Sequence, residues 1–488
     1  MSEIKTFAKQ TVIYGFSTII PRFLNYLLVP FYTRIFIPAE YGIITELYAY
    51  VAILLVVLSF GLETGYFRFF SSSKNNQIDV YSNIMNVIVF INIIFIGVIF
   101  YFNHSIAYFL NYSDHPEYII WFAIILSVDV LSSIPFAKLR YDERAVRFTL
   151  LKIAGVIINI GLNLFFFIYC PYLLKKNLDI IRIIYSPAIG IGYVFISNLI
   201  ASIVTFIFLI PEFKNYKLTF NPGFVKELIF YCFPLMLTGL GSNINETLDR
   251  ILIKHLVNDD NAIGQLGIYG ANIKIAVIIV LFTQMFRYAF EPFFFRKAQQ
   301  KNSPQLFADI LKYYVIINLC VFLIVTCFLE YFKFFIGKEY YSGLSIVPPV
   351  MISYIFLGIL VSLSVWYKVE NLTRYGIYIT LIGSLITIGG SFILIPWFGY
   401  QAAAWVKLIC YLSMCILSYI MGQRKYPIPY NIKQILFYFI LALFIFFVTS
   451  YVKLNDVFMF LFKTVLVVSF IIFVFMKEKI LIKLLRKE

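Results

Sequence analysis

Small, polar and charged residues recur at helical spacing within one otherwise apolar stretch, residues 228–256. They are Gly239, Ser242, Asn243, Glu246, Asp249, Arg250 and Lys254. Offsets of three, four and seven residues place them on one face of an α-helix. A charged group in the hydrocarbon core costs ~2.5–3.5 kcal/mol on insertion scales, so this face is predicted to line an aqueous cavity.

The chemistry that this face offers is the binding of an anion. One alternative is a self-neutralising network, in which Glu246 and Arg250 pair at i,i+4 on the same helix. Even with that pair formed, Lys254 leaves the face able to receive an anion.

Further basic residues lie inside apolar stretches and favour the same cavity. Arg22 lies about halfway along the first stretch, Lys274 near the outer third of the eighth, and Lys407 within the twelfth. Other basic residues lie near the ends of stretches, where snorkelling to the headgroups is the predicted behaviour. These are Arg34, Lys152, Arg287, Lys312 and Lys463.

Acidic residues inside the stretches are candidates for coupling to a proton or sodium ion. The candidates are Glu46, Asp129, Glu246 and Asp249. Asp129 has no basic neighbour within one helical turn in the sequence. The alternative for Asp129 is a carboxyl group hydrogen-bonded to Ser127 or Ser132.

These residues must be positioned by membrane-spanning helices. With 61% hydrophobic and 13% charged residues, the composition leaves little room for a soluble domain. Apolar stretches of ~20 residues match a bilayer core of ~30 Å at 1.5 Å rise per residue. About fourteen are predicted: Thr11–Thr33, Ile43–Gly65, Val80–Phe102, Tyr118–Phe136, Leu151–Pro171, Tyr185–Ile210, Leu228–Leu256, Gln265–Ala289, Ala308–Leu329, Ser345–Tyr367, Tyr375–Ile395, Ala402–Met421, Gln434–Tyr451 and Val457–Met476.

The net charge of +15 is explained by membrane orientation rather than by nucleic-acid binding. Lysines and arginines gather in alternate loops, for example Lys138 to Arg147 and Lys214 to Lys226. The positive-inside rule then places both termini in the cytoplasm, with the loop around Lys175 against the trend. The six cysteines show no metal-ligand spacing and are predicted to be small buried hydrophobes.

A short internal repeat predicts two halves. Tyr41-Gly42-Ile43 opens the second stretch, and Leu266-Gly267-Ile268 opens the eighth with a similar sequence after it. Six spans separate the copies, so the repeat is parallel and its pseudo-two-fold axis lies along the membrane normal. Chance similarity is the alternative. The predicted division is residues 1–225 (spans 1–6), 226–430 (spans 7–12) and 431–488 (spans 13–14 with a basic tail).

The sequence offers little for an enzyme. No GxxxxGK[ST], HExxH or GxSxG motif occurs, and no cofactor or metal site is predicted. A membrane-embedded polymerase or acyltransferase would need catalytic side chains on external loops. The one external cluster, Asp114-His115-Pro116-Glu117, is predicted to be a helix-entry turn.

Several motifs resemble those of the bacterial polysaccharide-transport flippases, which include the Wzx-type O-antigen flippases. This family lies within the multidrug/oligosaccharidyl-lipid/polysaccharide exporter superfamily. The matching motifs are Phe233-Pro234, Asp249-Arg250, residues 267–275, Phe286-Arg287, Glu291-Pro292, Tyr14-Gly15, residues 30–34 and residues 38–42. They identify the branch of the superfamily well and the substrate poorly.

The resemblance implies an all-α membrane protein with two six-helix lobes in a V around a central cationic cavity, plus two C-terminal helices. It also implies that an undecaprenyl-diphosphate-linked oligosaccharide crosses the bacterial inner membrane, driven by an ion gradient. Cationic cavity residues would hold the diphosphate, and Arg22, Arg250 and Lys274 are placed in that role. Lys254, Asn243 and Lys407 complete the predicted substrate site.

The implied function is surface polysaccharide biosynthesis, for O-antigen, capsule or exopolysaccharide. The expected partners are the lipid-linked substrate, a proton or sodium ion, inner-membrane lipids and other polysaccharide-assembly proteins, without nucleic acid. A multidrug cation antiporter of the same superfamily is the alternative within this fold. A cavity with surplus positive charge would repel cationic drugs, which favours the flippase.

Overall fold

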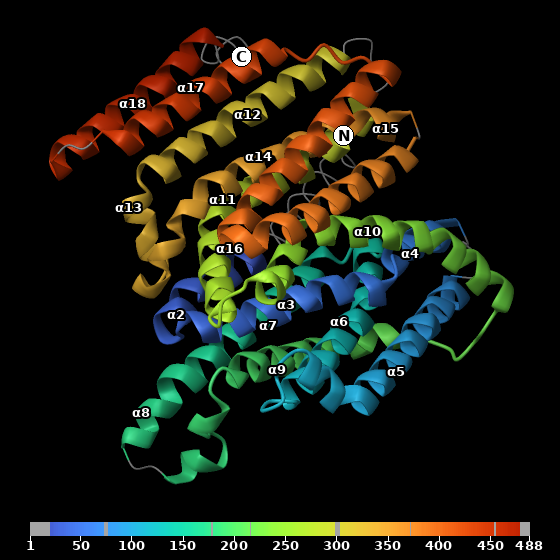
Figure 1. Cartoon of the computed structure of the whole chain (residues 1–488). Coiled ribbons are helices and arrows are strands. Elements are labelled where there is room, and N and C mark those ends of the chain that lie inside the picture. Colours follow the sequence, from blue (N-terminus) through green and yellow to red (C-terminus); the bar gives the residue numbers. More distant parts are fainter. Residues whose placement is uncertain are drawn as a thin grey trace. The chain divides into compact units, whose positions relative to one another are not determined.

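The computed structural model describes residues 20–72, 77–176, 179–214, 216–297, 303–370, 372–452 and 455–478. They are mostly helical and contain no β-strand, which confirms the predicted all-α class (Figure 1). The α-helices are α2 (Leu28–Ile35), α3 (Pro38–Ser59), α4 (Leu62–Ser72), α5 (Gln77–Phe109), α6 (Glu117–Tyr141), α7 (Ala145–Leu164), α8 (Cys170–Lys175), α9 (Gly192–Leu209), α10 (Pro222–Leu256), α11 (Ala262–Lys297), α12 (Ser303–Cys327), α13 (Leu329–Phe332), α14 (Val347–Leu363), α15 (Val365–Val369), α16 (Arg374–Lys425), α17 (Ile432–Tyr451) and α18 (Asp456–Lys477).

Twelve helical segments of the described residues are long and apolar enough to cross a bilayer. The chain is therefore a multi-pass membrane protein. The predicted count of fourteen is not confirmed. Residues 11–19 of the first predicted span lie outside the described residues, as do Lys5, Lys9 and the basic residues after position 478, which the orientation prediction also uses. Two other predicted spans, 375–395 and 402–421, form the single element α16.

The length of α16 is explained by a break in its backbone. Its 52 residues would extend ~80 Å as one straight helix, far beyond a bilayer core. Gly399 departs from helical geometry with φ 58° and ψ −146°. This left-handed conformation favours glycine, which has no Cβ to clash with the backbone. Gly399 lies within the predicted loop 396–401, so the sequence locates the break correctly.

The helices group into two compact units. The first unit comprises the described residues up to Phe31 together with Ile43–Thr247. The second unit comprises Tyr32–Gly42 and the described residues from Leu248 onward. Helix α10 therefore contributes residues to both units. The predicted division at residues 225 and 430 stays a prediction.

The core of the first unit lies among α4, α5, α6 and the start of α10. Tyr66, Ile84, Ile88, Val130 and Leu228 are fully buried in one apolar cluster. The ring of Tyr66 lies 4.7 Å from that of Phe70. Close packing supplies most of the stability here, because lipid tails are as apolar as the buried side chains.

In the second unit, ion pairs fix the two C-terminal helices to their neighbours. Helices α17 and α18 lie beside α12 (Figure 1). Lys312 of α12 pairs with Glu478 at 2.7 Å, and Lys463 of α18 pairs with Glu330 at 3.0 Å. The prediction that these lysines snorkel to the headgroups is wrong, because both side chains are mostly buried in these pairs.

Replacing Glu478 is expected to loosen the attachment of α17 and α18. Its Oε1 also accepts a hydrogen bond of 2.6 Å from the Tyr438 hydroxyl. In Glu478→Gln the Lys312 ammonium loses its closer carboxylate and keeps that of Asp309, whose Oδ1 lies 3.6 Å from Nζ. We therefore expect the free energy of unfolding to fall by ~1–2 kcal/mol and hydrogen exchange to become faster in both helices. The control is Lys463→Met, since its partner Glu330 is 45% exposed and stays solvated when the lysine is removed, so this loss is expected to be less than ~1 kcal/mol. Equal melting temperatures for the two variants would contradict this account.

Candidate functional site

A cluster of five charged side chains lies within the first unit, and we call it the first cluster. Its members are Arg22, Glu63 of α4, Asp129 and Arg140 of α6, and Lys152 of α7. Lys152 lies within electrostatic range of the other four. Arg140 Nη2 forms an ion pair with Glu63 Oε1. Three cations therefore share this region with two carboxylates.

Part of the first cluster is accessible at membrane depth. Arg22, Asp129 and Lys152 are all exposed residues. Asp129 lies at the midpoint of α6 (Glu117–Tyr141), ~18 Å from either end. A charged side chain exposed at that depth is costly in lipid, so it normally faces a water-filled space. This surface of the first unit therefore has the character of a cavity wall.

The surroundings of Asp129 differ from those predicted. Its carboxylate interacts with the hydroxyl of Ser202 on α9 and with Lys152. The predicted partners are wrong, since Ser132 Oγ donates to the Val128 carbonyl at 2.7 Å and the buried Ser127 Oγ has no hydrogen-bond partner among the described residues. Lys152 does not behave as the predicted headgroup anchor, because it lies beside Asp129, with Nζ 4.0 Å from the ring centroid of Phe136.

A second cluster lies within the second unit and is centred on Asp249. Lys407 Nζ of α16 lies 3.0 Å from Asp249 Oδ2. The Tyr269 hydroxyl of α11 donates to the same oxygen at 2.5 Å. Lys407 Nζ also lies 5.8 Å from the ring centroid of Tyr354. Asp249 and Lys407 are only 3% and 2% exposed, so the pair is withdrawn from water.

This geometry corrects the predicted placement of two site residues. Lys407 was expected to present its ammonium to a substrate, and instead it neutralises Asp249. Asp249 was expected on the open face of its helix, and instead it is buried against α11 and α16. A carboxylate held by an ammonium and a phenol is already satisfied, which leaves it poorly suited to exchange an ion.

The remaining predicted residues of α10 and α11 lie at partly exposed positions. These are Asn243, Glu246, Arg250, Lys254 and Lys274. Asn243 Nδ2 donates to the Gly239 carbonyl of its own helix at 3.2 Å. Arg250 lies within electrostatic range of Tyr41 and Tyr269. The Glu246–Arg250 pair and the role of Lys274 stay predictions.

Glu46 of α3 lies in a buried contact within the first unit. Its Oε2 accepts a hydrogen bond from the Tyr112 hydroxyl, which lies in the turn between α5 and α6. Burial and the neighbouring Glu46 carboxylate raise the pKa of Tyr112 above its usual range. This contact ties α3 to that turn, and the predicted ion-coupling role of Glu46 stays a prediction.

Comparison with known proteins places the chain in a family. Residues 7–297, more than half of the chain, match the family described as "Polysaccharide biosynthesis protein". The chain belongs to this family. A search of curated proteins finds no match.

The fold of this family member is similar to solved transporter structures. A structure described as the lipid II flippase MurJ in an inward closed conformation aligns with a TM-score of 0.72 at 15% identity, covering 96% of this chain and 99% of that chain. An inward-facing multidrug resistance transporter of the MATE family, within the MOP superfamily, aligns with a TM-score of 0.62 at 15% identity, covering 85% of this chain and 94% of that chain. A MATE protein in a straight conformation aligns with a TM-score of 0.60 at 12% identity, covering 86% of this chain and 95% of that chain. At these identities the likeness shows the shared fold.

Sequence reasoning missed three members of the first cluster, namely Glu63, Arg140 and Lys152. Arg140 lies in a basic run that the positive-inside rule assigns to a loop, and Lys152 lies near the start of its predicted span. The start of this helix could not be located from the sequence, where the apolar stretch begins at Leu151. In the structure α7 begins at Ala145, so Lys152 lies seven residues, ~10 Å, inside the helix.

Proposed function

We propose that the protein moves an undecaprenyl-diphosphate-linked oligosaccharide from the cytoplasmic to the periplasmic leaflet of the bacterial inner membrane. The product would supply O-antigen, capsule or exopolysaccharide synthesis. The family match and the likeness to a structure described as a lipid II flippase support this class of substrate. The observation that carries the proposal is the exposed first cluster, with its excess of one positive charge.

The first cluster suits a diphosphate. Arg22 offers a planar guanidinium whose paired N–H groups match phosphate oxygens, and Lys152 offers a compact ammonium. Both side chains are exposed, so a diphosphate would reach them without displacing a buried pair. The predicted roles of Arg250 and Lys274 as diphosphate contacts stay proposals.

Asp129 is the proposed ion-coupling residue of the first cluster. An exposed carboxylate beside a hydroxyl group and an ammonium can bind a proton or a sodium ion. Binding of either ion to Asp129 would change the net charge of the first cluster, and so its affinity for the diphosphate. Substrate and ion binding would then be linked through alternating access of the cluster to each leaflet.

A multidrug cation antiporter is the second candidate, supported by the likeness to MATE structures. The charge of the first cluster disfavours it, because three cations against two carboxylates repel a cationic drug. An enzyme that polymerises or acylates polysaccharide is disfavoured, because the solved structures of similar fold are described as a flippase and as multidrug transporters.

Lys152→Met is expected to reduce surface-glycan export ~10–100-fold, the loss that corresponds to one charge-assisted hydrogen bond. Export is measured by lectin labelling of intact cells that carry only the variant, with protein level followed by immunoblot. The matched control is Lys176→Met, because Lys176 Nζ also lies over an aromatic ring, 4.6 Å from that of Tyr172, outside the cluster. Normal export from Lys152→Met, or a gain in susceptibility to cationic drugs instead, would reject the proposal.

A further inference from the structure

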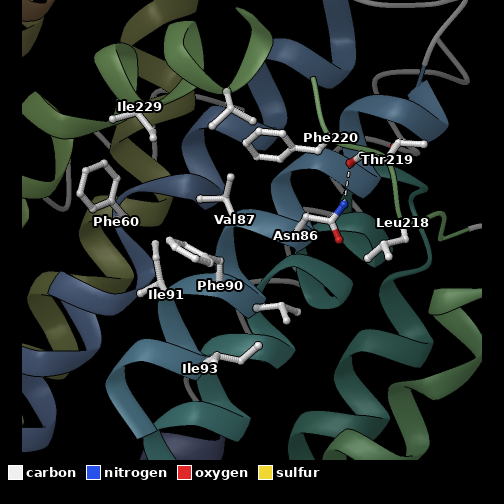
Figure 2. Close-up of a pocket in the computed structure, with 12 residues that line it drawn as sticks. Phe60, Asn86, Val87, Phe90, Ile91, Ile93, Leu218, Thr219, Phe220 and Ile229 are labelled. Atoms are coloured by element: carbon white, nitrogen blue, oxygen red, sulfur yellow. Dashed lines mark hydrogen bonds between the residues drawn. The ribbon is translucent and has the colours of Figure 1, made fainter. Parts of the chain in front are cut away.

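A cavity of about 610 Å³ opens on the first unit, and none of its lining residues belongs to the first cluster. Figure 2 shows its walls, which come from α5, from residues 218–220 and from the first turns of α10. Apolar side chains dominate the lining, among them Phe90, Ile93, Leu218, Phe220, Val225 and Ile229. The volume lies within the range of ~300–1,000 Å³ that is typical of small-molecule sites. We call this cavity the α5–α10 groove.

The groove is built by specific contacts. The segment before α10 is held along α5 by hydrogen bonds to three polar residues, Ser82, Asn83 and Asn86. The bonds are Lys217 N to Ser82 Oγ at 3.0 Å, Asn221 N to Asn83 Oδ1 at 2.7 Å, Asn86 Nδ2 to the Thr219 carbonyl at 2.6 Å, and the Tyr216 hydroxyl to Asn86 Oδ1. Figure 2 shows the bond between Asn86 and Thr219. This wall is therefore set before any ligand binds.

The α5–α10 groove faces the hydrocarbon chains of the bilayer. Helices α5 and α10 are both candidate membrane spans. Phe90, Ile93 and Leu218 are 63%, 64% and 89% exposed, which is typical of a lipid-facing surface. An apolar concavity on such a surface is filled by a lipid chain, because water gains no hydrogen bonds there.

Charge at one end of the groove indicates the kind of lipid. Lys217 precedes the lining residue Leu218 and Lys226 follows the lining residue Val225, and both lysines are exposed. Lys214 is also exposed, and Glu227 is the exposed carboxylate of this segment. The groove residues Val225 and Ile229 lie three and seven positions after Pro222, ~5–10 Å from the start of α10. The basic end therefore lies at the end of a spanning helix, at headgroup depth.

We propose that the α5–α10 groove binds an anionic phospholipid of the bilayer, with one acyl chain in the groove and the phosphate between Lys217 and Lys226. Each basic residue at the surface attracts anionic lipid, and the start of α10 adds the partial positive charge of a helix N-terminus. The lipid would brace the segment that leads into α10, the helix that contributes residues to both compact units. This inference does not rest on the proposed transport function.

Native mass spectrometry of the full-length protein in mild detergent tests the proposal, with phosphatidylglycerol and phosphatidylcholine as probes. We expect phosphatidylglycerol to be retained in preference to phosphatidylcholine. The double variant Lys217→Gln/Lys226→Gln is expected to bind phosphatidylglycerol ~30-fold more weakly. Ile229→Trp, which fills the groove, is expected to remove the bound lipid.

Matched controls come from α17, which carries an exposed lysine at its start and an exposed isoleucine on its surface. Lys433→Gln and Ile440→Trp are expected to bind phosphatidylglycerol as the unaltered protein does. Melting temperatures establish that each variant is folded. Unchanged binding by the Ile229→Trp variant, equal binding of the two phospholipids, or displacement of phosphatidylglycerol by undecaprenyl phosphate would each overturn the proposal. The last result would assign the groove to a substrate tail.

Discussion

Asp249→Leu and Lys407→Met are each expected to destabilise the protein by ~3–5 kcal/mol, the cost of breaking a buried ion pair by removing one partner. Asp249 Oδ2 and Lys407 Nζ lie 3.0 Å apart, and neither side chain has more than slight exposure. The remaining charge in either variant is left in a site that water does not reach. The melting temperature of the purified protein in detergent and its level in the membrane are the measurements.

The double variant Asp249→Leu/Lys407→Met is expected to recover much of this loss. Two apolar side chains of similar volume leave no buried charge, so the double variant should be more stable than either single variant. The matched control for the single variant Lys407→Met is Lys463→Met. Its partner Glu330 is 45% exposed and is therefore solvated when the lysine is removed. Additive losses in the double variant would contradict the pairing.

Export by the double variant separates a structural role from a transport role. If this pair only supports the fold, a stable double variant exports glycan normally. A stable double variant that fails to export would return Asp249 or Lys407 to the transport mechanism, where the sequence analysis first placed them. The two measurements together therefore decide between the predicted roles and the observed contact.

The spanning helices were predictable because their signal is local. Each apolar stretch must satisfy its own backbone hydrogen bonds in lipid, so length and hydropathy suffice to find it. The break at Gly399 was also local, since Pro396 and Gly399 interrupt the stretch in the sequence itself. Fine boundaries were less predictable. Helix α5 extends from Gln77 to Phe109, beyond the predicted 80–102 at both ends.

The partners of charged residues were not predictable, because they come from distant parts of the chain. Helical periodicity places Asp249 near Arg250 but contains no information about Lys407, which lies on α16. Asp129 similarly obtains Lys152 from α7 and Ser202 from α9. In both cases the sequence identified a carboxylate that is costly in lipid, and the structure was needed to identify the charged or polar side chains that neutralise it.

Two glycines of the predicted repeat lie in close contact with each other's segments. A Cβ added to Gly42 would lie 2.0 Å from the carbonyl oxygen of Ile263, and one added to Gly267 would lie 1.8 Å from that of Pro38. Ile263 precedes Gly267 by four residues, and Pro38 precedes Gly42 by four. The contact is therefore reciprocal, as expected where equivalent segments of a repeat cross at a two-fold axis. Both glycines lie within the second unit.

Gly267→Ala is expected to cost about 3 kcal/mol, at the upper end for overpacking, because the obstacle is a backbone carbonyl that cannot rotate away. Small residues at such crossings let helix backbones approach closely in a membrane. Gly97→Ala is the matched control on α5, where no atom lies within 4 Å of the added Cβ, and alanine there is expected to stabilise the helix by ~0.5–1 kcal/mol. Melting temperatures would thus move in opposite directions.

Because Gly42 and Gly267 share one crossing, separating the helices once relieves both clashes. The double variant Gly42→Ala/Gly267→Ala is therefore expected to cost less stability than the sum of the two single variants. Additive losses would show that the two clashes are independent and that the crossing is not a shared two-fold contact.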